Sequence, residues 1–592
     1  MANLSLTRPC LRLWTLSSPH RHRWQRPTTI TAFNRHLFGK SWFKVGKPPG
    51  VYILFPDVPS DTAENNELLS LPTEGRPIRF AKLSPEKCVK AVAKMSIEFD
   101  SCLDKLEQQL DQNKMSQSFD EVMAQIEQRL VPLDYGLCTL RLLRNVDKNR
   151  YDFRHFDQFF NRISMAKVRR FQSQPIYFFM REIQSNRDQL TGAQKRVVDK
   201  YLLEAKLFGS TLSAAELSAL NQIHKDLAEE RGKFNHNLME ATRRFTHTVD
   251  DPALLAVLPD ELIASIGSHS NATVTLHSSV FDPFMEYCPD RALRYNLWCA
   301  YNSRAAPGND RKISNSIIIE NIRFHRKQQA KVLGFENYID LSMETKMAHN
   351  LDNVRTFIST LHTKSKPAFD ANLKELTDFA RESGSHEGEK LELWDLPYWQ
   401  RKLLKVKYSI EDSAVKQYFP LNAVLDGMFG LAERLFDIKI ERVMKVDAWH
   451  KDVQLFRIMS TNTGAIVGSF YFDPYCRLNH KTSTSYNELA LNQYNLLSTK
   501  SVSYLITNFA EPVIDGQSTQ LSFSQIISRH VANGSPLPES EFDKIRRAHY
   551  HFASFDLKHE IYRMALDLAL YSSGNFWSDI RDQVWDEYMT PF

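Results

Sequence analysis

The stretch SAAELSALNQIHKDLAEERGKFNHNLME, residues 213–240, decides the fold class of this chain. Ser213 and Glu216 form the S-x-x-E pattern of a capping box, in which each residue satisfies a backbone N–H group of the other at a helix start. Behind it, apolar residues recur every three or four positions and would share one face of a long helix. They are Leu217, Leu220, Ile223, Leu227, Phe234 and Leu238. The same period, with helix starts such as Ser84-Pro85, dominates residues 83–379 and predicts a mainly α fold.

The composition is typical of a soluble globular protein with a large core. Of 592 residues, 42% are hydrophobic and 24% are charged, which excludes a disordered tail and a collagen-like fibre. We expect no membrane span, because no run of about 18 apolar residues occurs. The seven scattered cysteines contain no C-x-x-C pair, so we expect neither a zinc knuckle nor a disulfide framework, and we expect a reducing compartment.

The positive charge of the chain is concentrated at its start. Nine cations and no acidic residue precede Asp57, so the overall net charge of +5 leaves −4 for the remainder. A body without a basic stripe is not expected to bind nucleic acid. The Arg-rich, acid-free residues 1–50 have the composition of a transit peptide and linker, and predict a mitochondrial matrix protein. The alternative is a basic N-terminus without a targeting role.

A small sheet is expected within the helical chain. Residues 453–459 and 465–472 are short apolar and aromatic runs, and Asn462-Thr463-Gly464 between them is typical of a hairpin turn. Residues 504–509 could supply a third strand. We divide the remainder of the chain into an N-terminal helical region (51–245), a body (246–526) and a C-terminal helical region (527–592).

Several stretches, in sequence order from about residue 83 to about residue 525, resemble the thimet oligopeptidase and oligopeptidase A family of zinc metallopeptidases. They are KVLGFENYID (331–340), LSMETKMA (341–348), WDLPY (394–398), VDAWH (446–450), GSFYFDPY (468–475) with Arg477, and Asn508-Phe509. The resemblance implies a large helical ellipsoid with a central peptide channel and a small sheet beside the active site. It also implies zinc as cofactor and short peptides, including cleaved targeting peptides, as substrates, and we expect a monomer.

The zinc motif of the family is missing from this chain. Zinc-dependent hydrolysis needs three protein ligands, an open position for water and a carboxylate, which H-E-x-x-H helices supply together with a later Glu. The chain contains no H-E-x-x-H. Residues 521–525 resemble the lead-in to the zinc helix, whereas residues 527–538 resemble a part of the family well beyond it. We therefore predict that the metal-binding segment is cut out near Ile526-Ile527 and that the C-terminal region is truncated.

No other residues rebuild that site in the sequence. His386-Glu387 has Lys390 where a second His is needed, and His559-Glu560 has Arg563 in that place. On a helix, His549 and His551 would point apart, and His551 and His559 would lie about 12 Å apart along the axis. We therefore predict no catalytic residue and no metal ligand in this chain.

Tyr471, Arg477, Asn508 and Phe509 are the candidates for the wall of the substrate channel, with plain strand packing as the alternative. Asp473 and Arg477 are expected to form a structural ion pair. Cys476 and His480 lie close in sequence, but nothing else joins them as a nucleophilic pair.

Two hypotheses about function follow. In the first, the chain is an incomplete form of a zinc metalloendopeptidase, inactive as written, whose function belongs to a longer version. In the second, it is a pseudopeptidase that binds peptides or a protein partner without catalysis. The abrupt loss of a whole segment favours the first, because a drifting pseudoenzyme more often loses single ligands.

Overall fold

The computed structural model describes residues 43–45, 51–53, 61–72, 77–112, 118–151, 156–308, 311–384, 390–410, 412–477, 480–482, 485–509 and 528–590. Helices dominate these residues and the strands form small sheets, so the predicted mainly α fold is confirmed. Most of the predicted transit peptide, His386-Glu387 and the junction at Ile526-Ile527 lie outside the described residues. Among the described helices, none has both the length and the apolar character needed to cross a membrane.

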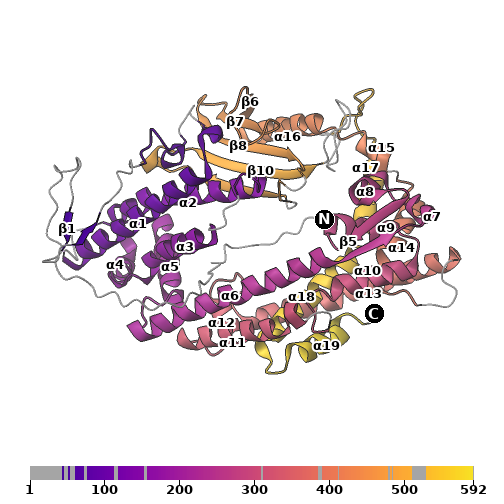
Figure 1. Cartoon of the computed structure of the whole chain (residues 1–592), viewed down its shortest axis with the longest axis horizontal. Helices are drawn as coiled ribbons and strands as arrows, with labels where there is room; N and C mark the ends of the chain where they lie inside the picture. Colours follow the sequence, from indigo (N-terminus) through magenta and orange to yellow (C-terminus); the bar gives the residue numbers. More distant parts are fainter. Residues whose placement is uncertain are drawn as a thin grey trace.

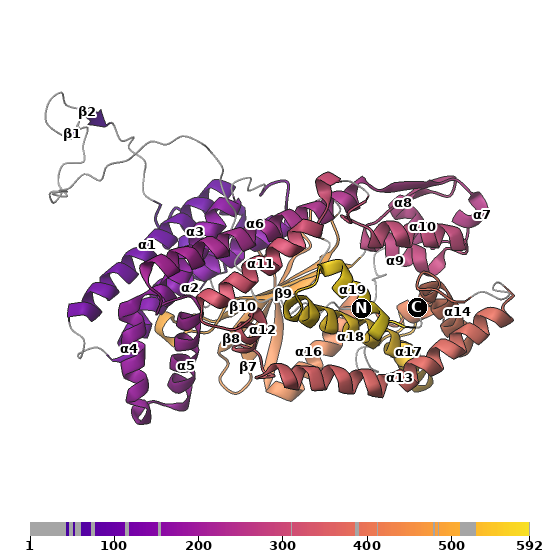
Figure 2. The same ribbon diagram turned by 90° about the horizontal axis from the view of Figure 1, so that it is seen from below.

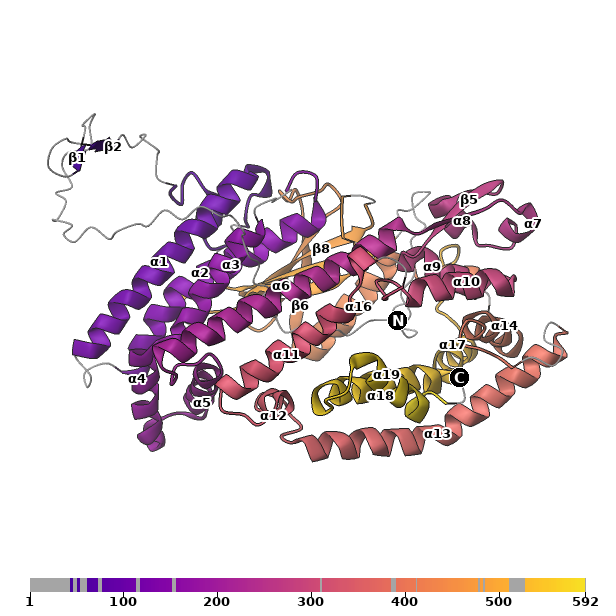
Figure 3. The same cartoon turned by 60° about the horizontal axis from the view of Figure 1, so that its bottom comes forward.

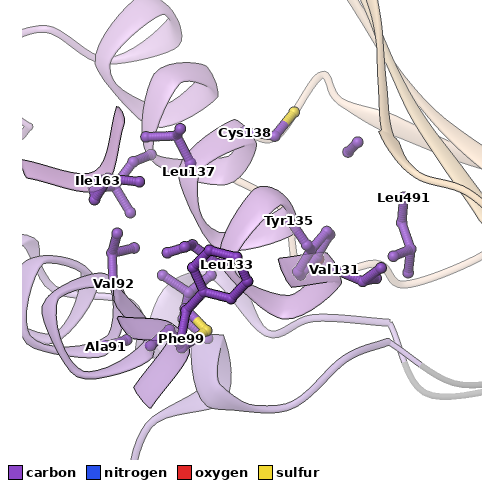
Figure 4. Packing of buried hydrophobic residues seen from close by; sticks show 14 of the residues in the cluster. Ala91, Val92, Phe99, Val131, Leu133, Tyr135, Leu137, Cys138, Ile163 and Leu491 are labelled. Carbon is purple, nitrogen blue, oxygen red and sulfur yellow. The ribbon is translucent and has the colours of Figure 1, made fainter. Parts of the chain in front are cut away.

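Five helices near the N-terminus pack around one hydrophobic core. They are α1 (Pro85–Gln112), α2 (Phe119–Val146), α3 (Phe156–Gln172), α4 (Gln174–Ser185) and α5 (Gly192–Leu207). The predicted start at Ser84-Pro85 is confirmed, because the Ser84 hydroxyl accepts a hydrogen bond from the Lys87 amide at 3.2 Å. Figure 4 shows Phe99 of α1 and Leu133 of α2 in this core, with Leu491 from a strand beside them. Helices and sheet therefore share one core.

The predicted sheet exists and has five strands. They are β6 (Ile438–Val443), β7 (Gln454–Ser460), β8 (Ile466–Tyr475), β9 (Tyr486–Leu491) and β10 (Ser501–Phe509), in the order β6-β7-β8-β10-β9. The hairpin of β7 and β8 is antiparallel, as predicted, and the predicted third strand, β10, pairs with β8 in parallel. One face packs against the N-terminal helices, while α16 (Leu421–Phe436) packs against the other (Figure 1). The core that α1–α5 share with β7–β10 spans residues on both sides of the predicted boundary at 245.

The stretch that decides the fold class forms α6 (Ala214–Arg244), one of the longest helices of the chain. Its capping box is present, with the Ser213 hydroxyl accepting from the Glu216 amide at 3.3 Å and the Glu216 carboxylate accepting from the Ser213 amide at 2.9 Å. Helix α11 (Ser316–Val332) lies along α6 (Figure 2). Asn237 of α6 donates to the side chain of Asn315, just before α11, at 3.0 Å.

A second small sheet follows α6 and was not expected from the sequence. Strand β5 (Asn271–Thr275) pairs antiparallel with both β3 (Thr246–Val249) and β4 (Gly267–Ser268). Four helices surround it in a core of its own: α7 (Pro252–Leu255), α8 (Asp260–Ile266), α9 (Ser278–Tyr287) and α10 (Arg291–Asn302). Near the N-terminus, β1 (Phe43–Val45) and β2 (Val51–Ile53) form a further antiparallel pair.

The remaining helices are α12 (Tyr338–Met343), α13 (Leu351–Glu382), α14 (Leu396–Tyr408), α15 (Asp412–Lys416), α17 (Glu539–His551), α18 (Ala553–Ser572) and α19 (Trp577–Tyr588). Helices α18 and α19 lie between α11 and α13 (Figure 3). Arg323 of α11 fixes the turn that joins them, because its guanidinium donates to the carbonyls of Leu570, Ser573 and Asn575 at 2.7–2.9 Å. Five short 3-10 helices complete the described structure: Glu67–Leu69, Phe80–Lys82, Arg187–Gln189, Arg311–Ile313 and Asn495–Leu497.

Candidate functional site

Three of the four predicted channel residues lie where β8 and β10 end. Asn508 and Phe509 are the last residues of β10, and Arg477 follows β8 by two residues. The two ends are adjacent, because Phe509 pairs with Tyr475 in the parallel register. Tyr471 lies further back in β8 and is only 2% exposed. The strand pairing therefore brings together residues that are more than 30 positions apart in sequence.

A completely buried carboxylate organises these strand ends. Asp473 of β8 has an exposed fraction of 0%. Arg477 binds it through two parallel hydrogen bonds, Nη1 to Oδ1 at 2.8 Å and Nη2 to Oδ2 at 2.7 Å. This bidentate geometry is the strongest that arginine makes with a carboxylate, and it confirms the predicted structural ion pair. The indole Nε1 of Trp449 donates to Oδ2 at 2.7 Å as well.

Lys481 is a second cation on Asp473, and sequence reasoning missed it. Its side chain is 0% exposed, and Nζ lies 2.9 Å from Asp473 Oδ1. The same ammonium donates to the main-chain carbonyls of Asp473 at 3.1 Å, Tyr475 at 2.8 Å and Thr507 at 2.6 Å. Since Thr507 belongs to β10, one buried cation connects the ends of both strands. We call Trp449, Asp473, Arg477 and Lys481 the Asp473 cluster.

The C-terminus of α2 lies against the loop that carries the two cations of the cluster. Arg477 Nη2 lies 3.4 Å from the carbonyl of Val146, the last residue of α2, and the Asn145 carbonyl accepts from the Thr482 amide at 2.7 Å. A helix C-terminus carries a partial negative charge, which offsets part of the excess charge of two cations on one carboxylate. The loop that carries Arg477 and Lys481 is therefore held against α2.

Electrostatics keep the Asp473 carboxylate ionised. Burial raises the pKa of Asp473, but the hydrogen bonds from Arg477 and Trp449 and the charge of Lys481 outweigh burial and hold the pKa below its ordinary value. Burial lowers the pKa of Lys481, against the attraction of Asp473. An ionised carboxylate whose oxygens are occupied by two cations and an indole cannot also take a proton from a reacting water.

Tyr471 and Phe509 pack on opposite faces of the sheet. The Tyr471 ring lies among Phe80, Trp449 and Tyr504, with ring centroids 5.4–5.8 Å away, in the core shared with the N-terminal helices. Phe509 is half-buried and packs against the cluster of α16 with the sheet. Their role in a peptide channel stays a prediction, because the described contacts are those of strand packing.

The stretch WDLPY (394–398) contains a second buried carboxylate, that of Asp395. Asp395 is 0% exposed and accepts from Arg291 Nε at 3.1 Å and from Arg294 Nη2 at 2.8 Å. Burial raises the pKa of Asp395, but the two arginines outweigh it and the pKa is lowered. Asp395 thus joins α10 to the start of α14. Both of its carboxylate oxygens accept hydrogen bonds from arginines, as both oxygens of Asp473 accept hydrogen bonds.

The histidines of the C-terminal helices are not assembled into a metal site. Glu560 forms an ion pair with Arg563 at 2.9 Å on the exposed side of α18. His551 contacts Tyr408 and Glu375 at 3.0 and 3.2 Å, away from that pair. Within the part of the chain that the structure describes, no three His, Cys, Asp or Glu side chains converge as metal ligands. These donor sets do not fit the zinc that the family implies.

His480 faces the end of α2 instead of pairing with Cys476. Its Nδ1 lies 3.2 Å from Asn149 Nδ2 and 4.0 Å from Asp147 Oδ1. Cys476 contributes its main chain, because its amide donates to the Phe509 carbonyl at 2.8 Å. His480 therefore connects the loop after β8 to the residues that follow α2, and Cys476 connects it to the end of β10.

The Asp473→Asn variant tests the Asp473 cluster. The neutral amide leaves Arg477 and Lys481 buried without a counter-charge, so we expect a loss of about 3–5 kcal/mol in the free energy of unfolding. In the wild type, the Asp473 carboxylate stabilises the fold fully at pH values above the pKa of about 3.9 that it has in the unfolded chain. This stabilisation is lost as the pH falls through the lower pKa that Asp473 has in the folded protein. Urea unfolding between pH 6 and pH 3 should therefore show a smaller acid dependence in the variant.

The control is Asp452→Asn, because Asp452 makes a half-buried contact with His450. It should change the free energy of unfolding by at most about 1 kcal/mol. Equal stability of both variants would contradict the account.

Comparisons of the sequence with known proteins find similar peptidases. Residues 284–528 match the model of peptidase family M3. The organellar oligopeptidase A of Arabidopsis thaliana, chloroplastic/mitochondrial, is 30% identical over 366 residues, 58% of this chain and 46% of the relative. The oligopeptidase A of Escherichia coli is 29% identical over 464 residues, 76% of this chain and 67% of the relative.

A second Arabidopsis relative, named as a cytosolic oligopeptidase A, is also 30% identical, over 58% of this chain and 52% of its own length. The chain spans about half the length of the two plant relatives. The matched region includes the stretches that carried the predicted resemblance, both ion-paired aspartates and the sheet. Over residues 284–528 the chain is therefore similar to peptidase family M3, and its relatives in this comparison include oligopeptidases A.

Proposed function

We propose that this chain is an incomplete form of an oligopeptidase A-like zinc metallopeptidase, and that on its own it does not hydrolyse peptides. Hydrolysis would belong to a longer version that contains H-E-x-x-H. One observation carries the proposal: stretches that resemble the family run in order to about residue 525, and residues 527–538 resemble a part of the family beyond the zinc helix, without the zinc segment between them. Zinc, where a longer version binds it, would polarise the peptide carbonyl and activate water.

The contacts of two buried aspartates, Asp473 and Asp395, support the same view. A general base must reach the water with a free carboxylate. Asp473 and Asp395, the completely buried aspartates of the matched region, are each held by two cations. They stabilise the body of the protein and are not placed for proton transfer.

The second candidate function is that of a pseudopeptidase, which binds short peptides or a protein partner without hydrolysis. The Asp473 cluster supports it, because its side chains hold the ends of β8 and β10 in a fixed arrangement. Similarity to peptidase family M3 supports short, unstructured peptides as the ligand class. A monomer suffices for this function.

An assay of the purified full chain with a quenched short peptide tests the first proposal. We expect no chelator-sensitive cleavage and far less than one zinc per chain, because three ligands and a general base are needed. Oligopeptidase A from Escherichia coli, assayed in parallel, is the positive control. Stoichiometric zinc together with chelator-sensitive cleavage would contradict the proposal. Fluorescence anisotropy with a labelled, unstructured peptide tests binding, and an absence of saturable binding would remove the second candidate.

We also propose that residues 1–50 direct the chain to the mitochondrial matrix. The support is their content of Arg and Lys without acidic residues, and an organellar relative. The relative named as cytosolic means that kinship alone does not decide the compartment.

A fusion of residues 1–50 to a fluorescent protein tests this targeting. We expect import into mitochondria, because transit peptides act through their positive charge. The control replaces Arg8, Arg12, Arg21 and Arg23 by Gln and should stay in the cytosol. Cytosolic fluorescence of the unaltered fusion would rule the proposal out.

A further inference from the structure

Strand β6 lies at one edge of the five-stranded sheet. Among the strands that the structure describes it pairs with β7 alone, and Figure 1 shows it as the outermost strand, beyond β7 and β8. The outer side of an edge strand presents main-chain N–H and C=O groups to which another strand can add. The outer side of β6 is therefore a surface on which a further strand can pair.

Every second residue of β6 directs its main-chain groups outward, away from β7. The Asp437 carbonyl, just before β6, accepts from the amide just after β7 at 3.0 Å, so the residues that alternate with Asp437 hydrogen-bond to β7. The Ile440 amide accordingly points outward, and it donates to the Glu433 carboxylate of α16 at 2.8 Å. The outer row thus consists of Ile438, Ile440 and Arg442.

Two copies of β6 can pair through their outer rows in an antiparallel arrangement about a two-fold axis. An axis at Ile440 places the amide and carbonyl of Ile440 opposite those of its copy. The same axis places Lys439 opposite Glu441 of the second copy, and Glu441 opposite the second Lys439. Within one chain Lys439 Nζ and Glu441 Oε1 already lie 2.6 Å apart, so both side chains extend from the same face of the strand.

A shift of the axis by one residue removes this complementarity. An axis at Lys439 sets two lysines against each other, and an axis at Glu441 sets two glutamates against each other. Opposite charges across antiparallel strands are stabilising, and like charges directly opposite are destabilising. The charges of β6 thus select the axis at Ile440, and they match a second copy of this strand.

Exposed apolar side chains lie at both ends of β6. Leu435 and Phe436, at the end of α16, are 65% and 69% exposed, and Met444, just after β6, is 76% exposed. Phe436 and Met444 are each four positions from Ile440, so the axis at Ile440 would bring Met444 of one copy towards Phe436 of the other. Removing this apolar surface from water favours association, and methionine sulfur packs well against an aromatic ring.

We propose that two copies of this chain associate by antiparallel pairing of their β6 strands about a two-fold axis at Ile440, which joins the two sheets into one. Glu433 competes with this pairing, because its carboxylate must leave the Ile440 amide before the second copy can accept that hydrogen. One pair of short strands is a small interface, so we expect a dissociation constant on the order of 10–100 µM. The peptide binding proposed above needs one chain only and does not depend on this association.

Sedimentation of the full chain, at concentrations on both sides of that dissociation constant, tests the pairing through two charge reversals. Lys439→Glu and Glu441→Lys should each raise the dissociation constant at least about tenfold, because each sets like charges opposite each other twice. An equimolar mixture of the two variants should associate at least as well as the wild type, because one chain then carries two acidic and the other two basic side chains at the paired positions. Thermal unfolding of each variant checks that it is folded.

The Glu433→Ala variant tests the competition for the Ile440 amide. Association should become about three- to tenfold stronger, because one hydrogen bond no longer has to be broken. Asp426→Ala, at an exposed carboxylate of the same helix, is the matched control and should associate as the wild type does. The proposal is wrong if the wild-type chain stays monomeric throughout, if both charge reversals associate like the wild type, if their mixture does not recover association, or if Glu433→Ala associates no more strongly.

Discussion

The arrangement of the sheet depends on the burial of one carboxylate, that of Asp473. An ionised carboxylate can lie in a protein interior only if it is paired and hydrogen-bonded. Arg477 and Lys481 from the loop after β8 and Trp449 from before β7 meet that demand. To reach Asp473, the loop after β8 must turn back against α2, and Lys481 must pass beside the end of β10. The positions of both strand ends follow from this pairing.

Local patterns in the sequence predicted the elements that depend on local interactions. The capping box at Ser213, the helix behind it and the turn between β7 and β8 are all set by residues within a few positions of one another. The pair of Asp473 with Arg477 was also expected, since the two residues are four positions apart. All of these predictions concern contacts between residues that lie close together in the sequence.

What could not be predicted depends on contacts over long distances in the sequence. Nothing around Lys481 distinguishes it from a surface lysine, because its burial results from the packing of α2, β8 and β10 around it. Strand β5 has few apolar residues and was missed for the same reason, since its stability comes from pairing with β3 and from α8 and α9.

Residues 284–528 match the model of peptidase family M3, and the sequence contains no H-E-x-x-H motif. The stretches that resemble the family include Asp395 and Asp473, the two buried aspartates that are paired with cations. A double-mutant cycle between Asp473→Asn and Lys481→Met tests most directly whether the Asp473 cluster acts as one unit. The account predicts that the loss of stability in the double variant is about 2 kcal/mol smaller than the sum of the losses in the two single variants. The reason is that removing both charges leaves less buried charge without a partner than removing either one. Losses that add to within about 0.3 kcal/mol would contradict it.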